Sequence, residues 1–215
     1  MKRGEIVGLL GPNGAGKTTT FYMIMGIVKP HQGKVFLDNI EITNFPMYKR
    51  ANLGVIYLPQ EPSIFKKMSV WDNIYSLLEL KGFPKEICIE ETEKVLKLMG
   101  IYHLKNSKGY MLSGGERRRL EIARSLAMHP SFLLLDEPFT GIDPKTRQEI
   151  QDIIVDLRKL NMGILITDHN VRETLEITDR SYIIYEGKIF KEGKTEDLIN
   201  DPILKKIYLG DKFKL

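Results

Sequence analysis

The sequence predicts an α/β fold in which a mostly parallel sheet is covered by helices and interrupted by a helical insertion. Short, almost wholly apolar runs at residues 6–10, 132–135 and 164–167 are typical of parallel strands buried on both faces. Apolar residues at helical spacing follow the first two runs, so strands and helices alternate. Residues from about 66 to 110 are helical in pattern and separate two predicted strands. A length of 215 residues suits one domain, 1–215.

Capping and turn residues set the limits of the individual elements. The predicted elements are a strand at 6–10, a helix from Gly16 to about Gly26, strands at 34–37 and 54–58, helices within 66–110, a helix at about 115–128, a strand at 132–136, a helix from 144, a strand at 164–167 and a hairpin at 181–191. Ser113 is a typical helix N-cap, and Pro144 suits the first helical position. The pair Glu186-Gly187 suits a two-residue hairpin turn.

Composition narrows the class of protein. The 32 Lys and Arg against 28 Asp and Glu give a net charge of +4, less than a dedicated nucleic-acid binder usually concentrates, so no nucleic-acid partner is expected. A single cysteine, Cys88, excludes a disulfide framework. No run reaches the roughly 18–20 apolar residues of a membrane span, and the N-terminus does not resemble a signal peptide. We expect a soluble protein on the cytoplasmic side that reaches a membrane only through a partner.

A phosphate-binding loop follows the first predicted strand. The pattern of Gly, four residues, Gly-Lys-Thr is met by Gly11-Pro12-Asn13-Gly14-Ala15-Gly16-Lys17-Thr18, and Thr19 follows it. Glycines let successive N–H groups point at a phosphate, and the helix N-terminus adds partial positive charge. Lys17 can bridge the β- and γ-phosphates of ATP, and the Thr18 hydroxyl can ligate Mg²⁺. The alternative, a glycine-rich turn with an incidental lysine, does not explain the position between strand and helix.

Two carboxylates end a buried strand farther along the chain. Asp136 and Glu137 follow the apolar run 132–135, at the sheet edge where open α/β sheets bind ligands. Asp136 would hold Mg²⁺, and Glu137 could orient or deprotonate a water that attacks the γ-phosphorus. Their alternative interpretation is a solvated turn.

A second small-residue segment opens a helix. Leu112-Ser113-Gly114-Gly115-Glu116 precedes it, and such a helix start can bind an anion as well as being simply capped. A single nucleotide does not need two phosphate-binding segments from the same chain. In a head-to-tail pair of chains, however, the second segment of each chain would close the nucleotide site of the other. The arginine run at 117–119 is interpreted as a solvated face.

Together these motifs resemble the nucleotide-binding subunits of ATP-binding cassette (ABC) transporters, which have a P-loop NTPase fold with a helical subdomain, here about 66–125. The resemblance adds three parts, in family order: a Q-loop glutamine (Gln60) that ligates Mg²⁺, a D-loop (Gly141-Ile142-Asp143) whose Asp143 is expected to bind nucleotide, and a switch histidine (His169) at the γ-phosphate. It implies that Ser113, Gly114, Gly115 and Glu116 form the signature that closes the partner's site. Glu116 stands where most members carry Gln, a variant that we do not expect to affect hydrolysis.

Four further segments resemble the ATPase subunits of lipopolysaccharide exporters. They are 58–65, 115–124, 166–175 and the tail Tyr208-Leu209-Gly210-Asp211-Lys212-Phe213. This implies a homodimer docked on two membrane-spanning permease subunits at the cytoplasmic face of the inner membrane, where ATP hydrolysis extracts lipopolysaccharide for export to the outer membrane. Two alternatives remain: an ATPase for another ABC transporter, such as one for branched-chain amino acid uptake, and a soluble ABC ATPase acting on DNA or ribosomes.

One departure concerns the segment before the first strand. Family members usually carry about two dozen further residues there, including an aromatic that stacks on adenine. We expect either a truncated chain or a late start codon. A native protein beginning at Met1 would bind ATP more weakly and select adenine poorly, because base stacking contributes about 1–3 kcal/mol.

Overall fold

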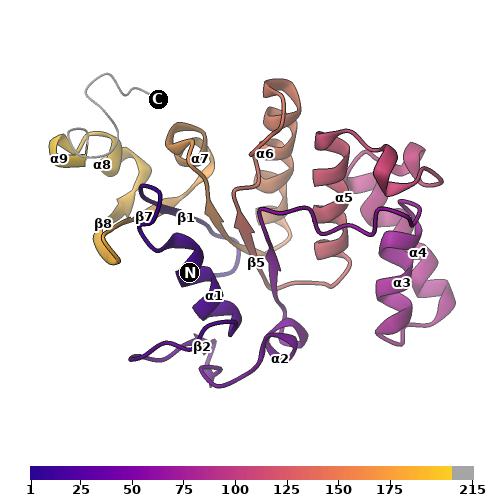
Figure 1. Ribbon diagram of the computed structural model, residues 1–215, viewed down its shortest axis with the longest axis horizontal. Coiled ribbons are helices and arrows are strands. Elements are labelled where there is room, and N and C mark those ends of the chain that lie inside the picture. The colour runs from indigo at the N-terminus through magenta and orange to yellow at the C-terminus, as the bar shows by residue number, and fades with distance from the viewer. Residues whose placement is uncertain (205–215) are drawn as a thin grey trace.

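A six-stranded sheet in the order β4-β5-β6-β1-β7-β8 forms the centre of the structure, a computed structural model that describes residues 1–204 (Figure 1). The strands are β1 (Ile6–Leu10), β4 (Val55–Leu58), β5 (Phe132–Asp136), β6 (Gly163–Thr167), β7 (Arg180–Tyr185) and β8 (Lys188–Lys194). Neighbouring strands pair in parallel, except that β7 and β8 form the predicted antiparallel hairpin. The predicted α/β class with a mostly parallel sheet is confirmed.

Helices cover both faces of this sheet. They are α1 (Lys17–Met25), α2 (Met47–Asn52), α3 (Asp72–Leu80), α4 (Lys85–Leu98), α5 (Gly114–Leu126), α6 (Pro144–Lys159), α7 (Val171–Ile177), α8 (Thr195–Ile199) and α9 (Pro202–Leu204), with short 3₁₀ turns η1 (Tyr102–Leu104) and η2 (Gly109–Met111). Alternate residues of β5 belong to different cores, because successive strand side chains point to opposite faces. Leu133 and Leu135 join the core with α3 to α6, whereas Leu134 packs with Phe21 and Met25 of α1.

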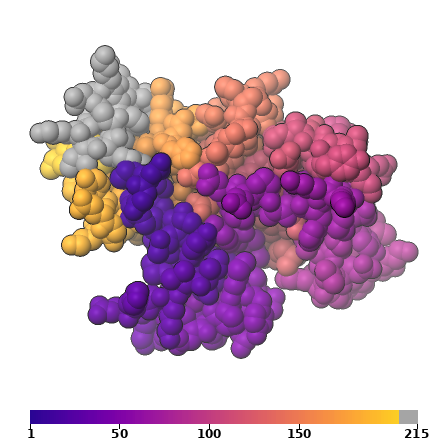
Figure 2. All heavy atoms as spheres, viewed as in Figure 1, coloured from indigo at the N-terminus to yellow at the C-terminus, as the bar shows by residue number. Residues whose placement is uncertain are grey.

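The helical segment between β4 and β5 lies at one end of the molecule, and β8 with α8 lies at the other (Figures 1 and 2). Leu78 of α3 and Leu96 of α4 are fully buried and share the core of α5 and α6. The segment returns to its own start where Ser69 and Lys108 form an antiparallel bridge. Its apolar residues therefore connect it directly to the sheet through α5.

Several local expectations were wrong or incomplete. The strand expected at 34–37 is only β2 (Phe36–Leu37), and it pairs with β3 (Ile40–Glu41) outside the main sheet. The strand stays short because the chain reverses at Asp38, whose φ is 51°. Phe36 is exposed, whereas Leu37 is buried in the core that β5 shares with α1. The helix expected at about 115–128 starts at Gly114 and ends at Leu126. Helices α2, α7 and α8 were not predicted, since five to seven residues show too little periodicity.

Within residues 1–204, every helix is too short or too polar to cross a membrane. The tail segment Tyr208 to Phe213, which carries part of the family resemblance, lies outside the described residues.

Candidate active site

The loop between β1 and α1 needs glycine for steric reasons. A Cβ on Gly11 would lie 2.2 Å from the carbonyl oxygen of Ile184, so a larger residue would force β7 away. Gly14 and Gly16 have φ of 76° and 105°, a region that favours glycine. This turn leads directly into α1. The first N–H groups of that helix, at Lys17, Thr18 and Thr19, have no acceptor within the helix and can bind a ligand. A phosphate fits this end of α1 because these donors and the helix dipole converge there.

Lys17 extends back over this loop. Its Nζ donates to the carbonyl oxygens of Gly11 at 2.7 Å and Pro12 at 3.0 Å, and the residue is 7% exposed. Burial lowers the pKa of Lys17, while the charges of Glu137, Asp136 and Asp168 oppose that shift. The ammonium group therefore already faces the carboxylates that end β5 and β6, and it can exchange its loop carbonyls for phosphate oxygens.

Asp136 is held at the end of β5 by the two neighbouring strands. Its Oδ2 accepts from the Tyr57 hydroxyl at 3.0 Å, and its Oδ1 accepts from the Thr167 hydroxyl at 3.3 Å. Burial and the nearby Asp136 charge raise the pKa of Tyr57, which stays a neutral donor. The sequence analysis missed both partners. The signal was available, since Tyr57 and Thr167 lie near the ends of the predicted strands 54–58 and 164–167.

Glu137, directly after β5, has a strained backbone. Its φ is 46°, a left-handed conformation for a residue with a Cβ, and its N–H donates to the Thr167 carbonyl at 2.8 Å. The Glu137 side chain is 13% exposed, and its Oε1 lies 3.0 Å from Nδ1 of His169. The structure thus brings together the two residues that the sequence analysis nominated for catalysis. Thr140, which it missed, also contacts both.

The signature segment begins α5 with a capping box. The Ser113 hydroxyl accepts from the N–H of Glu116 at 3.3 Å, and the Glu116 carboxylate accepts from the N–H of Ser113 at 2.8 Å. Gly115 packs so closely on the first turn of α6 that a Cβ would lie 2.2 Å from Cγ2 of Thr146. Asp143 caps that turn by accepting from the N–H of Thr146 at 3.0 Å, and these hydrogen bonds lower its pKa. The signature and the D-loop are therefore neighbours in one chain.

Gln60 is exposed, two residues beyond the end of β4. The backbone beside it is fixed by Arg118 of α5, which donates to the carbonyl oxygens of Pro59 and Pro138 at 3.1 Å each. Arg118 also pairs with Glu121 at 2.9 Å, and the two side chains are 6% and 3% exposed. The interpretation of residues 117–119 as a solvated face is therefore wrong for Arg118. Burial follows because this arginine fills the junction between α5, β4 and β5.

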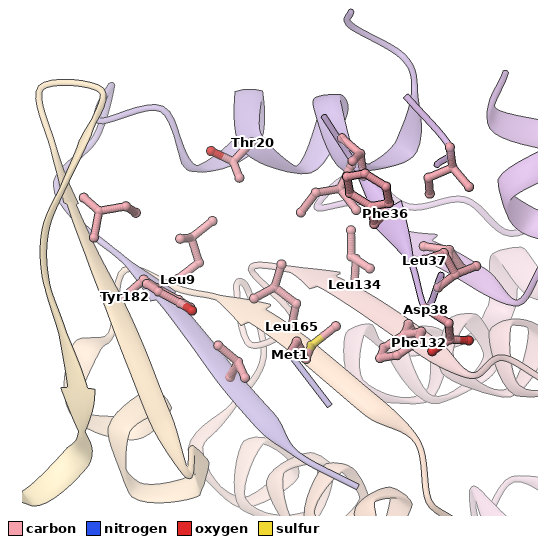
Figure 3. A pocket seen from close by; sticks show the side chains of 16 residues that line it. Met1, Leu9, Thr20, Phe36, Leu37, Asp38, Phe132, Leu134, Leu165 and Tyr182 are labelled. Carbon is pink, nitrogen blue, oxygen red and sulfur yellow. The ribbon is translucent and has the colours of Figure 1, made fainter. Parts of the chain in front are cut away.

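An apolar pocket of about 530 Å³ lies between the sheet and α1, and its lining includes Asp38 but neither Asp136 nor Glu137 (Figure 3). Leu134, Leu165 and Tyr182 of the sheet line it opposite Thr20 of α1. Its lining is mostly apolar and contains none of the residues of the phosphate loop or the carboxylate cluster described above, so we assign this pocket no part in the phosphate chemistry.

Comparison with known proteins identifies the family. The sequence profile described as "ABC transporter" matches residues 1–140. The chain belongs to the ABC transporter family. It is an ATP-hydrolysing cassette, as the sequence predicts.

Two relatives carry the same descriptive name. The chain is 53% identical over 212 residues to the lipopolysaccharide export system ATP-binding protein LptB of Acidithiobacillus ferridurans, covering 99% of this chain and 88% of the relative. It is 51% identical over 212 residues to LptB of Haemophilus influenzae, covering 98% and 88%. Among solved structures, the chain matches the ATP-binding cassette MJ0796, which was solved as a dimer in a post-hydrolysis state bound to ADP and Pi. The TM-score is 0.79 and the sequence identity is 26%, and the match covers 91% of this chain and 87% of that one.

Proposed function

We propose that this chain is the ATP-hydrolysing subunit of an ABC transporter that extracts lipopolysaccharide from the inner membrane for export to the outer membrane. The observation that carries the proposal is identity above 50% to two LptB proteins over nearly the whole chain. The active-site geometry supports the ATPase part, because Lys17, Asp136, Glu137 and His169 converge at one edge of the sheet.

The phosphate loop, Gly11 to Thr19, is the proposed binding site for the phosphates of ATP. Lys17 leaves the carbonyls of Gly11 and Pro12 to neutralise phosphate oxygens, at low cost since the group is already desolvated. Thr18, Gln60 and Asp136 would hold Mg²⁺, which supplies positive charge to the phosphates; one carboxylate with neutral oxygen donors suits this cation. Tyr57 and Thr167 fix the orientation of the Asp136 carboxylate.

Glu137 and His169 are the proposed catalytic residues. The Glu137 carboxylate accepts a hydrogen bond from the attacking water and so orients it. His169 donates a hydrogen bond to the γ-phosphate. Their 3.0 Å contact supports this proposal, because it shows that the two side chains lie side by side at the end of β5.

Two copies of the chain complete each site. Ser113, Gly114, Gly115, Glu116 and Asp143 of one copy would close over nucleotide bound by the other, which the dimeric MJ0796 cassette supports. We take residues 1–215 as one domain, in which the helical subdomain of about 66–125 transmits closure to two membrane-spanning permease subunits. The protein then lies peripherally on the cytoplasmic face of the inner membrane.

The test isolates the chain from native membranes with a mild detergent. The expected result is co-purification of two membrane-spanning subunits, with ATP-driven release of lipopolysaccharide from reconstituted vesicles. The Glu137→Gln variant should bind ATP and dimerise with little phosphate release. Partner subunits that move amino acids and leave lipopolysaccharide in place would reject the export proposal, and full turnover by Glu137→Gln would reject the catalytic assignment.

A further inference from the structure

Thr140 completes a ring of three polar side chains at the end of β5. It lies between β5 and α6, three residues after Glu137. Its hydroxyl oxygen is 3.3 Å from Oε2 of Glu137 and 3.3 Å from Nε2 of His169. On the other edge of the imidazole, Nδ1 is 3.0 Å from Oε1 of Glu137. Each of the three side chains therefore touches both others.

Counting hydrogens shows what the Thr140 hydroxyl contributes. An ionised carboxylate only accepts, so Nδ1 of His169 must carry hydrogen to bond Glu137. When Nε2 also carries hydrogen it donates to the hydroxyl, which in turn donates to Oε2. When Nε2 lacks hydrogen, the hydroxyl donates to Nε2 instead. A hydroxyl suits both states of the ring, whereas a methyl group suits neither.

The surroundings assign this hydroxyl to the site rather than to the fold. Thr140 is exposed, and its side-chain hydrogen bonds among residues 1–204 go only to Glu137 and His169. The 3.3 Å distances are at the long end for hydrogen bonds, and catalytic contacts of this length commonly tighten once the substrate is bound.

We propose that Thr140 is a positioning residue for ATP hydrolysis, whose hydroxyl holds the His169 ring and the Glu137 carboxylate in their mutual orientation. The inference rests on the proposed catalytic roles of those two residues. A ring held by Nδ1 alone can rotate about that contact, which moves Nε2 away from the place where a γ-phosphate oxygen would replace the hydroxyl at that nitrogen. The hydroxyl removes this freedom by holding the opposite nitrogen.

The test compares two substitutions in the full chain. Thr140→Val keeps the shape and removes the hydroxyl, and Thr140→Ser keeps the hydroxyl. We expect Thr140→Val to lower kcat for ATP hydrolysis about tenfold and to change KM less than about twofold, because the phosphate loop is untouched. Thr140→Ser should keep at least about a third of the parent kcat. The matched control is Thr195→Val. Thr195 begins α8, and its hydroxyl donates to the Thr178 carbonyl at 2.9 Å, so removing this hydroxyl should not change kcat.

A second measurement separates positioning from general damage. In a His169→Ala background, Thr140→Val should lower kcat by less than about a further twofold, because the imidazole ring that the Thr140 hydroxyl holds is absent. Equal tenfold losses in both backgrounds, an unchanged kcat in Thr140→Val, or a Thr140→Ser variant as slow as valine would overturn the inference. Thr140→Ala supplies a second hydroxyl-free variant if valine unfolds. Undiminished hydrolysis by Glu137→Gln would overturn the proposed catalytic role of Glu137, whereas failure of the Thr140 variants alone would overturn only the inference about Thr140.

Discussion

The close contact between Gly115 and Thr146 predicts a steric defect that a second substitution repairs. An alanine Cβ at Gly115 would lie 2.2 Å from Cγ2 of Thr146, where carbon atoms normally stay about 3.5–4.0 Å apart. The overlap of about 1.3 Å must be relieved by a shift of the Thr146 side chain or by separation of the starts of α5 and α6. Overpacking of this kind typically costs about 1–3 kcal/mol, so we expect Gly115→Ala to lower the free energy of unfolding by that amount.

Thr146→Ser removes the clashing methyl and keeps the hydroxyl. The nearest remaining Thr146 atoms are Cβ at 3.2 Å and Oγ1 at 3.3 Å from the added Cβ, distances that small shifts can absorb. The double variant should therefore recover all but about 1 kcal/mol of the loss. The assay is urea unfolding of the full chain followed by circular dichroism, in which the midpoint and slope give the free energy.

Gly114→Ala is the matched control in the same helical turn. Its added Cβ meets the Gly141 carbonyl oxygen at 3.4 Å, an ordinary contact, so its stability should stay within about 0.5 kcal/mol of the parent. The steric argument fails if Gly115→Ala is as stable as Gly114→Ala, or if adding Thr146→Ser restores nothing. A functional role of the signature in the partner's site cannot produce this pattern, because the unfolding of a single chain is measured.

Three further predictions concern buried polar groups. Tyr57→Phe removes a donor to Asp136, so we expect the free energy of unfolding to fall by about 1–2 kcal/mol and the affinity for Mg²⁺ to fall as well. Urea unfolding measures the first quantity, and the Mg²⁺ dependence of ATP hydrolysis measures the second. Unchanged values of both would contradict the importance of this hydrogen bond. Arg118→Met leaves Glu121 buried without its partner and should cost about 3–5 kcal/mol, and adding Glu121→Leu should restore most of it in the same assay. Burial, with a smaller contribution from Glu137, raises the pKa of Asp168, so its folded form resists ionisation and the chain loses stability as pH rises from about 4 through that pKa. Asp168→Asn should therefore raise the melting temperature at pH 8 more than at pH 4, and a constant difference would refute the sign.

The local motifs were predictable because their chemistry is contained in consecutive residues. The phosphate loop needs glycines, a lysine and a helix start within eight positions, and all of these are contiguous. The N-cap at Ser113 was likewise predictable from the residue type, and the structure confirms it and adds a capping box with Glu116, three positions later. The strand and helix types followed from hydrophobic periodicity wherever an element was long or flanked by turn residues.

Contacts across the sheet were not predictable because they depend on register and strand order. Tyr57 reaches Asp136 only because β4 lies beside β5, with Tyr57 opposite Leu134. Thr140 meets His169 because the turns after β5 and β6 lie side by side. Arg118 is surrounded by Pro59 and Pro138, which are distant in sequence. No pattern near Thr140 or Arg118 distinguishes them from solvated neighbours.

The sequence by itself determined the phosphate chemistry, since a backbone anion cradle and its lysine are set by short-range sterics and hydrogen bonding. It also determined the parallel sheet, because apolar runs must be buried on both faces. Only the tertiary structure decided which hydroxyls hold Asp136, Glu137 and His169, and which arginine of residues 117–119 is buried. Those contacts join side chains between 3 and 79 positions apart, and their angstrom-scale distances follow from strand register and helix packing rather than from any local residue pattern.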